Sequence, residues 1–233
     1  MWKSRLLTLL ACTWAPIGAH AALTESEELW LAAVGPVVSY ARTQLLPVDI
    51  IVQPQDTPGQ APLAMGYMNG RCKLVMSMRG NPSAESTMES IPAELFKPVA
   101  EAIAAHEVAH CWRHAHGAWH TLPAGFVDTT PSRFQDKVFA QRVQTMRETR
   151  REEGYADLVG LAWTLRHHPD LYAQVHQWFV KTREYQPVPG SHHDTRNWIR
   201  LAQDPNTFAP GGTPFEQVVA TWERGLTEED EDD

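Results

Sequence analysis

A five-residue run, His-Glu-Val-Ala-His at positions 106–110, constrains the fold of this chain more than any other feature. Pro98 can occupy the first turn of a helix, and Gly117 is typical of a helix end, so the pattern predicts a helix over 98–117. A helix turns once every 3.6 residues, and the two histidines are four residues apart. We therefore expect both imidazoles to point from one helical face toward one place.

Two histidines in this arrangement can bind one metal ion, and zinc is the ion that the pattern indicates. Zinc lowers the pKa of its bound water to about 7, and the water can then attack a carbonyl carbon. Glu107 lies beside His106 and His110, where its carboxylate can take the proton of that water. A chain with 11 histidines can also contain such a run by chance, in an ordinary helix. The interpretation therefore needs a third ligand.

The sequence offers two candidates for the third protein ligand that a catalytic zinc usually has. Glu153 precedes Asp157 by one helical turn, so Glu153 could bind the metal while Asp157 holds the far nitrogen of a ligating histidine. His116 matches the third histidine of the metzincin pattern, but Arg113 stands where that pattern needs glycine. In a continuing helix, His116 would lie about 15 Å along the axis from His106. Glu153 is therefore preferred.

The run at 106–110 and the segment Glu-Gly-Tyr-Ala-Asp at 153–157 together resemble the gluzincin metallopeptidases, and look most like the branch containing HtpX and the CAAX prenyl endopeptidases. The resemblance implies one zinc ion per chain and hydrolysis of peptide bonds by a zinc-activated water, with internal cleavage of a protein or peptide substrate. The site residues that it implies are the zinc ligands His106, His110 and Glu153, the general base Glu107, and Asp157 as partner of a ligating histidine.

Two further expectations come from the same resemblance. A hairpin at 64–78 could present an edge strand that aligns an extended substrate by strand addition. His192 and His193 lie in a segment similar to one in that branch, where a histidine could donate to an oxyanion or reversibly cap the zinc. The family segment usually has proline where this chain has His193. A loop in which Asp194 or Thr195 caps the next helix is the alternative.

Hydrophobic periodicity predicts helices elsewhere in the chain, with strands near its first third. Besides the helix at 98–117, the predicted helices cover 26–46, 132–168, 171–185, 195–202 and 215–224, the last ended by Gly225. The region over 132–168 opens with the capping-box pair Ser132 and Gln135, runs with interruptions and ends before Pro169.

Strand patterns cover less of the sequence. Asn69-Gly70 suits a two-residue turn between strands over 64–68 and 71–78, and 48–53 is typical of a further short strand. Segment 80–90 has the composition of a loop. We therefore expect a helix-dominated α+β fold, formed by a single metallopeptidase-like domain over 22–225 whose small sheet packs on the zinc-site helices.

The beginning of the chain is typical of an exported protein. A basic start is followed by an apolar stretch over 6–17 and by small residues at Ala19 and Ala21, which predicts a signal peptide over 1–21. The stretch is shorter than the roughly 20 apolar residues of a spanning helix, so we expect no stable membrane insertion after cleavage. Lipoprotein processing at Cys12 is the alternative. The expected location is the periplasm or the exterior of the cell.

Charge and cysteine content add three expectations. The formal net charge is −8, and nothing in the sequence indicates the basic patch that nucleic-acid binding would need, so we expect no nucleic-acid partner. Part of that charge lies in the last residues, and 226–233 is predicted to be an acidic, disordered tail. Cys72 and Cys111 could form a disulfide in an exported protein, but two buried thiols are an equal alternative.

Two functions other than proteolysis are compatible with the same residues. An exported zinc-binding scaffold or chaperone-like module without turnover would keep the metal and close its coordination with a fourth protein ligand, such as His192 or His193. A metal-handling protein would use the dense histidines over 106–120 and bind more than one ion. The intact set of ligands and base favours the enzyme.

Overall fold

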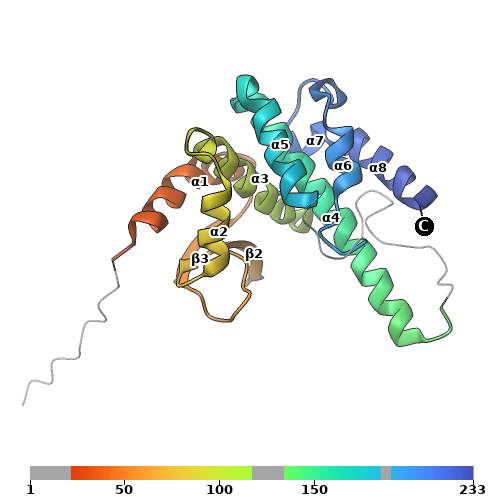
Figure 1. Cartoon of the computed structure of the whole chain (residues 1–233), viewed down its shortest axis with the longest axis horizontal. Coiled ribbons are helices and arrows are strands. Elements are labelled where there is room, and N and C mark those ends of the chain that lie inside the picture. Colours follow the sequence, from red (N-terminus) through yellow and green to blue (C-terminus); the bar gives the residue numbers. More distant parts are fainter. Residues whose placement is uncertain (1–21, 117–133, 185–189, 233) are drawn as a thin grey trace, which may run out of the picture.

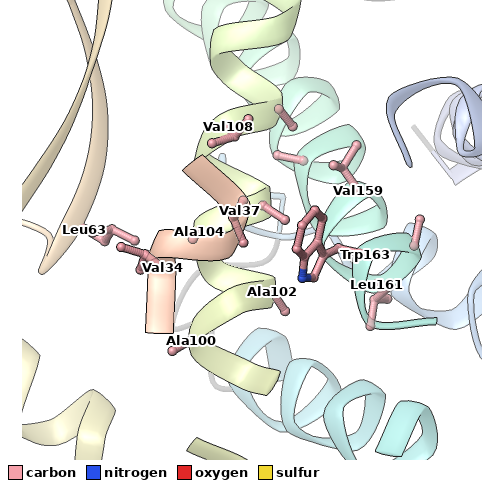
Figure 2. Close-up of a cluster of buried hydrophobic side chains, with 14 of the residues drawn as sticks. Val34, Val37, Leu63, Ala100, Ala102, Ala104, Val108, Val159, Leu161 and Trp163 are labelled. Atoms are coloured by element: carbon pink, nitrogen blue, oxygen red, sulfur yellow. The ribbon is translucent and has the colours of Figure 1, made fainter. Parts of the chain in front are cut away.

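Three long helices form the frame that positions the rest of the chain (Figure 1). This computed structural model describes residues 22–116, 134–184 and 190–232. Helix α3 (Phe96–Ala115) packs against both α1 (Glu25–Thr43) and α4 (Lys137–His167), and buried side chains of all three helices meet in the core (Figure 2). The predicted helix around the His-Glu-x-x-His run is therefore present, and it lies in the interior.

Small side chains let α3 approach its neighbours closely. The buried alanines of this helix are Ala100, Ala102, Ala104, Ala105 and Ala109. On α4, Gly160 lies against α3 so closely that a Cβ atom at 160 would be 2.7 Å from the carbonyl oxygen of Ala102. A backbone oxygen at that distance leaves no room for a methyl group. The spacing of α3 and α4 therefore depends on the missing side chain of Gly160.

Helix α4 runs without interruption for 31 residues, and its two halves have different surroundings. Its first turns project beyond the other helices (Figure 1), whereas most side chains from 150 to 164 are buried. Asp136 caps the helix, because its carboxylate accepts hydrogen bonds from the backbone N–H groups of Val138 and Phe139 at 2.8 Å and 3.0 Å. The start predicted at Ser132 lies outside the described residues.

The sheet has three strands in the order β1-β3-β2. Strands β2 (Leu63–Met68) and β3 (Arg71–Arg79) form the predicted antiparallel hairpin, and β1 (Val48–Pro54) pairs with β3 in parallel. Asn69 and Gly70 have φ angles of 55° and 72°, which a two-residue type I′ turn requires. Strand β2 is an edge strand, and it lies beside α3.

The sheet and α3 are joined covalently and by a hydrogen bond. Cys72 of β3 and Cys111 of α3 form a disulfide, which decides between the two alternatives that the sequence left open. The Tyr67 hydroxyl of β2 donates to the backbone carbonyl of His110 at 2.6 Å. Both contacts fall beside the second histidine of the run. They hold the sheet at a fixed position against that end of α3.

One segment that was expected to be a loop is a helix. Helix α2 (Pro82–Ser90) replaces the loop predicted over 80–90. Asn81 caps it, because the Asn81 side-chain oxygen accepts from the backbone N–H of Ser83 at 3.0 Å. The Asn81 amide also donates to the carbonyl of Ser77 at 2.7 Å, and the residue is fully buried. The prediction was wrong because these tertiary contacts outweigh a polar composition.

Four further helices contact α4, namely α5 (Tyr172–Glu184), α6 (Arg196–Leu201), α7 (Pro214–Gln217) and α8 (Val219–Asp232). The short 3-10 segments are η1 (Ala93–Leu95), η2 (Pro169–Leu171) and η3 (Pro205–Thr207). The described residues thus form a helix-dominated α+β domain with a small mixed sheet, as the sequence predicted.

The end of the chain differs from its prediction in two ways. Gly225 does not end a helix but lies inside α8, where a Cβ atom would be 2.2 Å from Nε1 of Trp198. Gly225 therefore serves close packing. The acidic run, which was expected to be disordered, is helical as far as Asp232. Glutamate is a good helix former and neither glycine nor proline follows 225, so α8 continues.

Two expectations concern export and membrane insertion. The signal peptide predicted over 1–21 and its alternative processing site lie outside the described residues. Within the described ranges, none of the helices combines the length and the apolar character that crossing a bilayer would demand.

Replacing Gly160 with alanine should destabilise the domain, because the new methyl group would collide with the Ala102 carbonyl. We expect the free energy of unfolding to fall by about 1–3 kcal/mol, as in other overpacked cores. Urea unfolding followed by circular dichroism measures this. Gly66→Ala is the control, since its Cβ would meet only the Lys73 oxygen at an ordinary 3.8 Å. Equal stability of the two variants would contradict the proposed close contact.

Candidate metal centre

Three side chains from two helices converge on one place. His106 and His110 lie on α3 and Glu153 lies on α4. The two Nε2 atoms of the histidines are 3.3 Å apart, and the Glu153 carboxylate oxygens lie 3.3 Å and 3.5 Å from them. One ligand atom from each residue falls within 4.8 Å of the others. Two imidazole nitrogens and a carboxylate in this arrangement could hold a metal ion.

A carboxylate fixes the ring of His106. Nδ1 of His106 lies 2.8 Å from an Asp157 oxygen, which leaves Nε2 directed at Glu153. Asp157 is fully buried and also accepts hydrogen bonds from Arg183, at 2.8 Å and 2.6 Å, and from the Thr195 hydroxyl at 2.5 Å. Burial raises the pKa of Asp157, but Arg183 and His106 outweigh it, so the pKa lies well below its ordinary value.

A second carboxylate does the same for His110, and the sequence analysis missed it. Nδ1 of His110 lies 2.8 Å from an oxygen of Glu152, whose other oxygen is 3.0 Å from a guanidinium nitrogen of Arg113. Glu152 and Arg113 are both buried. The sequence predicted no role for Arg113, which stands where the metzincin pattern needs glycine. Its spacing of three residues after His110 is the signal that could have indicated a role near that ring.

Glu107 lies between two cavities. Both cavities, of about 190 Å³ and about 410 Å³, are lined by His106, Glu107, Glu153 and His193. Burial raises the pKa of Glu107 above its ordinary value, although the neighbouring histidines oppose this shift. The Glu107 carboxylate also accepts a hydrogen bond from the backbone of Met65. Glu107 lies beside His106, His110 and Glu153, which together are called the metal group below because they could hold an ion. This position and its raised pKa suit Glu107 to accept a proton.

The two cavities have different walls. The larger one runs along the edge strand β2, at Leu63, Met65 and Tyr67, and reaches Thr149 of α4. The walls of the smaller cavity are mainly apolar and aromatic, and they include Trp30, Leu63, Ile103, Trp178 and Phe179. The His106, His110 and Glu153 group therefore adjoins two cavities, one along the edge strand and one with largely apolar walls.

Of the two downstream histidines, the structure brings only one to the site. His193 lines both cavities, and its Nε2 lies 3.7 Å from an oxygen of Glu153. Burial lowers the pKa of His193, so its ring is neutral at neutral pH. His192 is exposed and borders neither cavity. Of these two histidines, only His193 is therefore close enough to act at the metal group.

The rival third ligand lies elsewhere. His116 is exposed at the end of α3, where its Nδ1 is 2.7 Å from the carbonyl oxygen of Trp112 and its ring stacks on that indole. His114 stacks on Tyr67 with ring centroids 3.5 Å apart. Neither belongs to the metal group, because α3 continues past the run and carries both rings away from it.

A tryptophan from a distant segment supports Glu153. Gly154 follows Glu153, and a Cβ atom at 154 would lie 2.4 Å from the Trp198 ring. The Trp198 N–H donates to the carbonyl of Trp222 at 3.0 Å, which holds the ring in place. The glycine thus lets the indole pack directly against the turn of α4 that carries the candidate ligand.

Without metal, the site should hold a proton that zinc must displace. Burial lowers the pKa of His106, but Asp157 and Glu153 outweigh it and raise this pKa to about 10. A protonated imidazole cannot bind a metal, so zinc affinity should rise with pH up to about 10, by roughly tenfold per unit for one released proton. Calorimetric zinc titrations in two buffers of different ionisation enthalpy count that proton. Binding at pH 7.5 without proton release would contradict the expectation.

Replacing Glu152 with glutamine should weaken zinc binding, because the His110 ring loses a charged acceptor at Nδ1. We expect an affinity about 10–100-fold lower, the usual effect of removing such a partner. Competition with a fluorescent chelator measures the affinity, and circular dichroism monitors folding. Glu94→Gln, at an exposed position before α3, is the control. An affinity equal to that of the control would show that Glu152 does not support the ligand.

No protein-family model, curated protein or solved structure matches the chain.

Proposed function

We propose that this chain is a zinc-dependent peptidase that cleaves within protein or peptide chains. The observation that carries the proposal is the place of Glu107, which lies beside the His106, His110 and Glu153 group and lines both adjoining cavities. A carboxylate with a raised pKa next to a three-ligand metal group is the arrangement of a metal-assisted hydrolase.

Zinc suits the donors that this group offers. Two imidazoles and one carboxylate are a frequent set in catalytic zinc sites, and they leave room for a water or a substrate oxygen. His106, His110 and Glu153 would hold one ion, with Asp157 and Glu152 fixing the two rings. When bound, zinc would supply a Lewis acid that makes a water molecule acidic enough to react near neutral pH.

The chain's own residues would move the proton. Glu107 would take a proton from the attacking water and deliver it to the leaving amine as the peptide bond breaks. The raised pKa of Glu107 brings it closer to neutral pH, where a group can accept and release a proton in one cycle. His193 would donate a hydrogen bond to the oxygen of the tetrahedral intermediate, since its ring borders both cavities.

The cleft walls suit an extended polypeptide. The outer edge of β2 borders the larger cavity, so a substrate strand could pair with backbone groups there. The smaller cavity would take one substrate side chain. Its walls include Trp30, Ile103 and Phe179, so we expect that side chain to be apolar.

We also propose that the protein works outside the cytoplasm. The Cys72–Cys111 disulfide supports this location, because disulfides persist mainly in oxidising compartments. The signal peptide predicted over 1–21 agrees with it.

A scaffold that binds zinc without turnover is the second candidate, and one distance favours it. Nε2 of His193 is only 3.7 Å from Glu153, so His193 could become a fourth protein ligand and close the coordination sphere. The peptidase remains preferred because a closed structural site leaves Glu107 without a function.

Glu107→Gln tests the proposal, because glutamine keeps the size of the side chain but cannot accept the proton. We expect one tightly bound zinc per chain, as in the unchanged protein, with cleavage of a fluorogenic peptide mixture reduced by at least about 10²–10⁴-fold. Metal analysis and initial rates measure both. Glu94→Gln is the control. Zinc-dependent cleavage that survives in Glu107→Gln would exclude the mechanism. If the unchanged zinc-loaded protein cleaves no peptide, the scaffold is favoured.

A further inference from the structure

The projecting half of α4 exposes an unusual number of apolar side chains. Four of the nine large hydrophobic side chains that are exposed in the described residues lie between 134 and 146. Among them, Val138 is 65% exposed, Phe139 49% and Met146 36%. This part of the helix extends beyond the neighbouring helices (Figure 1). Such exposure of aromatic and aliphatic groups is costly in water and typical of a binding surface.

Two of these side chains, Phe139 and Met146, share a helical face with the candidate metal ligand Glu153. Phe139, Met146 and Glu153 follow one another at intervals of seven residues in a single continuous helix. Seven residues correspond to almost two full turns, with a drift of only about 20° per interval. The apolar surface is therefore aligned with the side chain that faces the metal group.

The same face leads into the cleft. Thr149, one turn after Met146, lines the larger cavity together with Glu153. With a rise of 1.5 Å per residue, Met146 lies about 10 Å and Phe139 about 21 Å along the helix from Glu153. An extended polypeptide covers about 3.3 Å per residue. A substrate leaving the cleft along α4 would reach these side chains about three to six residues from the bond being cleaved.

We propose that Phe139 and Met146 bind an apolar segment of the substrate outside the cleft, about three to six residues from the cleaved bond. This inference rests on the proposed peptidase function and specifies its substrate class. The preferred substrates are polypeptides long enough to reach the projecting half of α4 and unfolded enough to expose apolar residues there. Folded proteins, which bury such residues, and peptides confined to the cleft lack this contact.

The substrate fits this surface better than a second copy of the chain does. The exposed apolar surface consists of a few side chains and amounts to at most several hundred Å². A stable dimer usually buries about 1,200–2,000 Å², so this surface is too small to hold two copies together. Its continuity with the cleft gives a substrate already held at the metal group a second contact at little entropic cost.

Peptides of different length test the proposal. A short fluorogenic peptide would span only the cleft. Two longer peptides would each carry eight additional residues with apolar side chains, placed before the cleaved bond in one peptide and after it in the other. We expect one longer peptide to have a kcat/KM about tenfold higher through a lower KM, the effect of partly burying two apolar side chains. In the double variant Phe139→Ser, Met146→Ser, the ratio of kcat/KM for that longer peptide to kcat/KM for the short peptide should fall close to one.

Gln141→Ser is the matched control, since Gln141 is exposed in the same turns of α4 but points away from this face. Gln141→Ser should keep the wild-type ratio. A ratio retained by the double variant would overturn the proposal. So would a dimer, or binding to anionic phospholipid vesicles, that the double variant loses, because either would assign the surface to another partner.

A binding measurement separates this surface from catalysis. If the zinc-loaded protein cleaves no peptide, the proposed peptidase function fails, while the surface can still be tested. Fluorescence anisotropy of the longer peptides would then compare the Glu107→Gln protein with the same protein carrying Phe139→Ser and Met146→Ser. About tenfold weaker binding by the triple variant supports the surface, and equal binding overturns it.

Discussion

The close packing of α3 on α4 sets the geometry of the candidate metal centre and of the elements around it. Gly160 meets the backbone of Ala102 without an intervening side chain, so the two helices approach more closely than ordinary core residues would permit. This spacing brings His106 and His110 opposite Glu153. A wider separation would leave the two imidazoles on one helix without the carboxylate on the other, and no group of three ligands would form.

Buried charge then determines how the ligands are oriented. Each histidine ring uses Nδ1 to contact a carboxylate, and each of those carboxylates is opposed by an arginine. An isolated buried carboxylate would take up a proton and lose its hold on the ring, so Arg183 keeps Asp157 suitable as an acceptor. Arg113 forms the corresponding ion pair with Glu152. The arrangement costs desolvation energy but directs both Nε2 atoms to one point. A metal ion would recover part of that cost by binding there.

Three different surfaces adjoin the metal group. The edge strand β2, the apolar pocket and the continuous face of α4 all adjoin the same cluster of ligands. The Cys72–Cys111 disulfide and the Tyr67 contact hold the sheet against α3, so the cleft between them keeps its shape. Helices and a strand that are fixed in this way can position a long polypeptide at several points along its length.

The helix that carries His106 and His110, the spacing of Glu153 and Asp157, and the hairpin turn could all be predicted from the sequence, because periodicity and turn chemistry act between near neighbours. The contact of Glu152 with His110, the exposed position of His192 and the packing role of Gly225 follow only from the folded arrangement. Each of these depends on contacts between residues far apart in the chain. Such contacts leave no fixed spacing in the sequence, since they arise from how the helices pack.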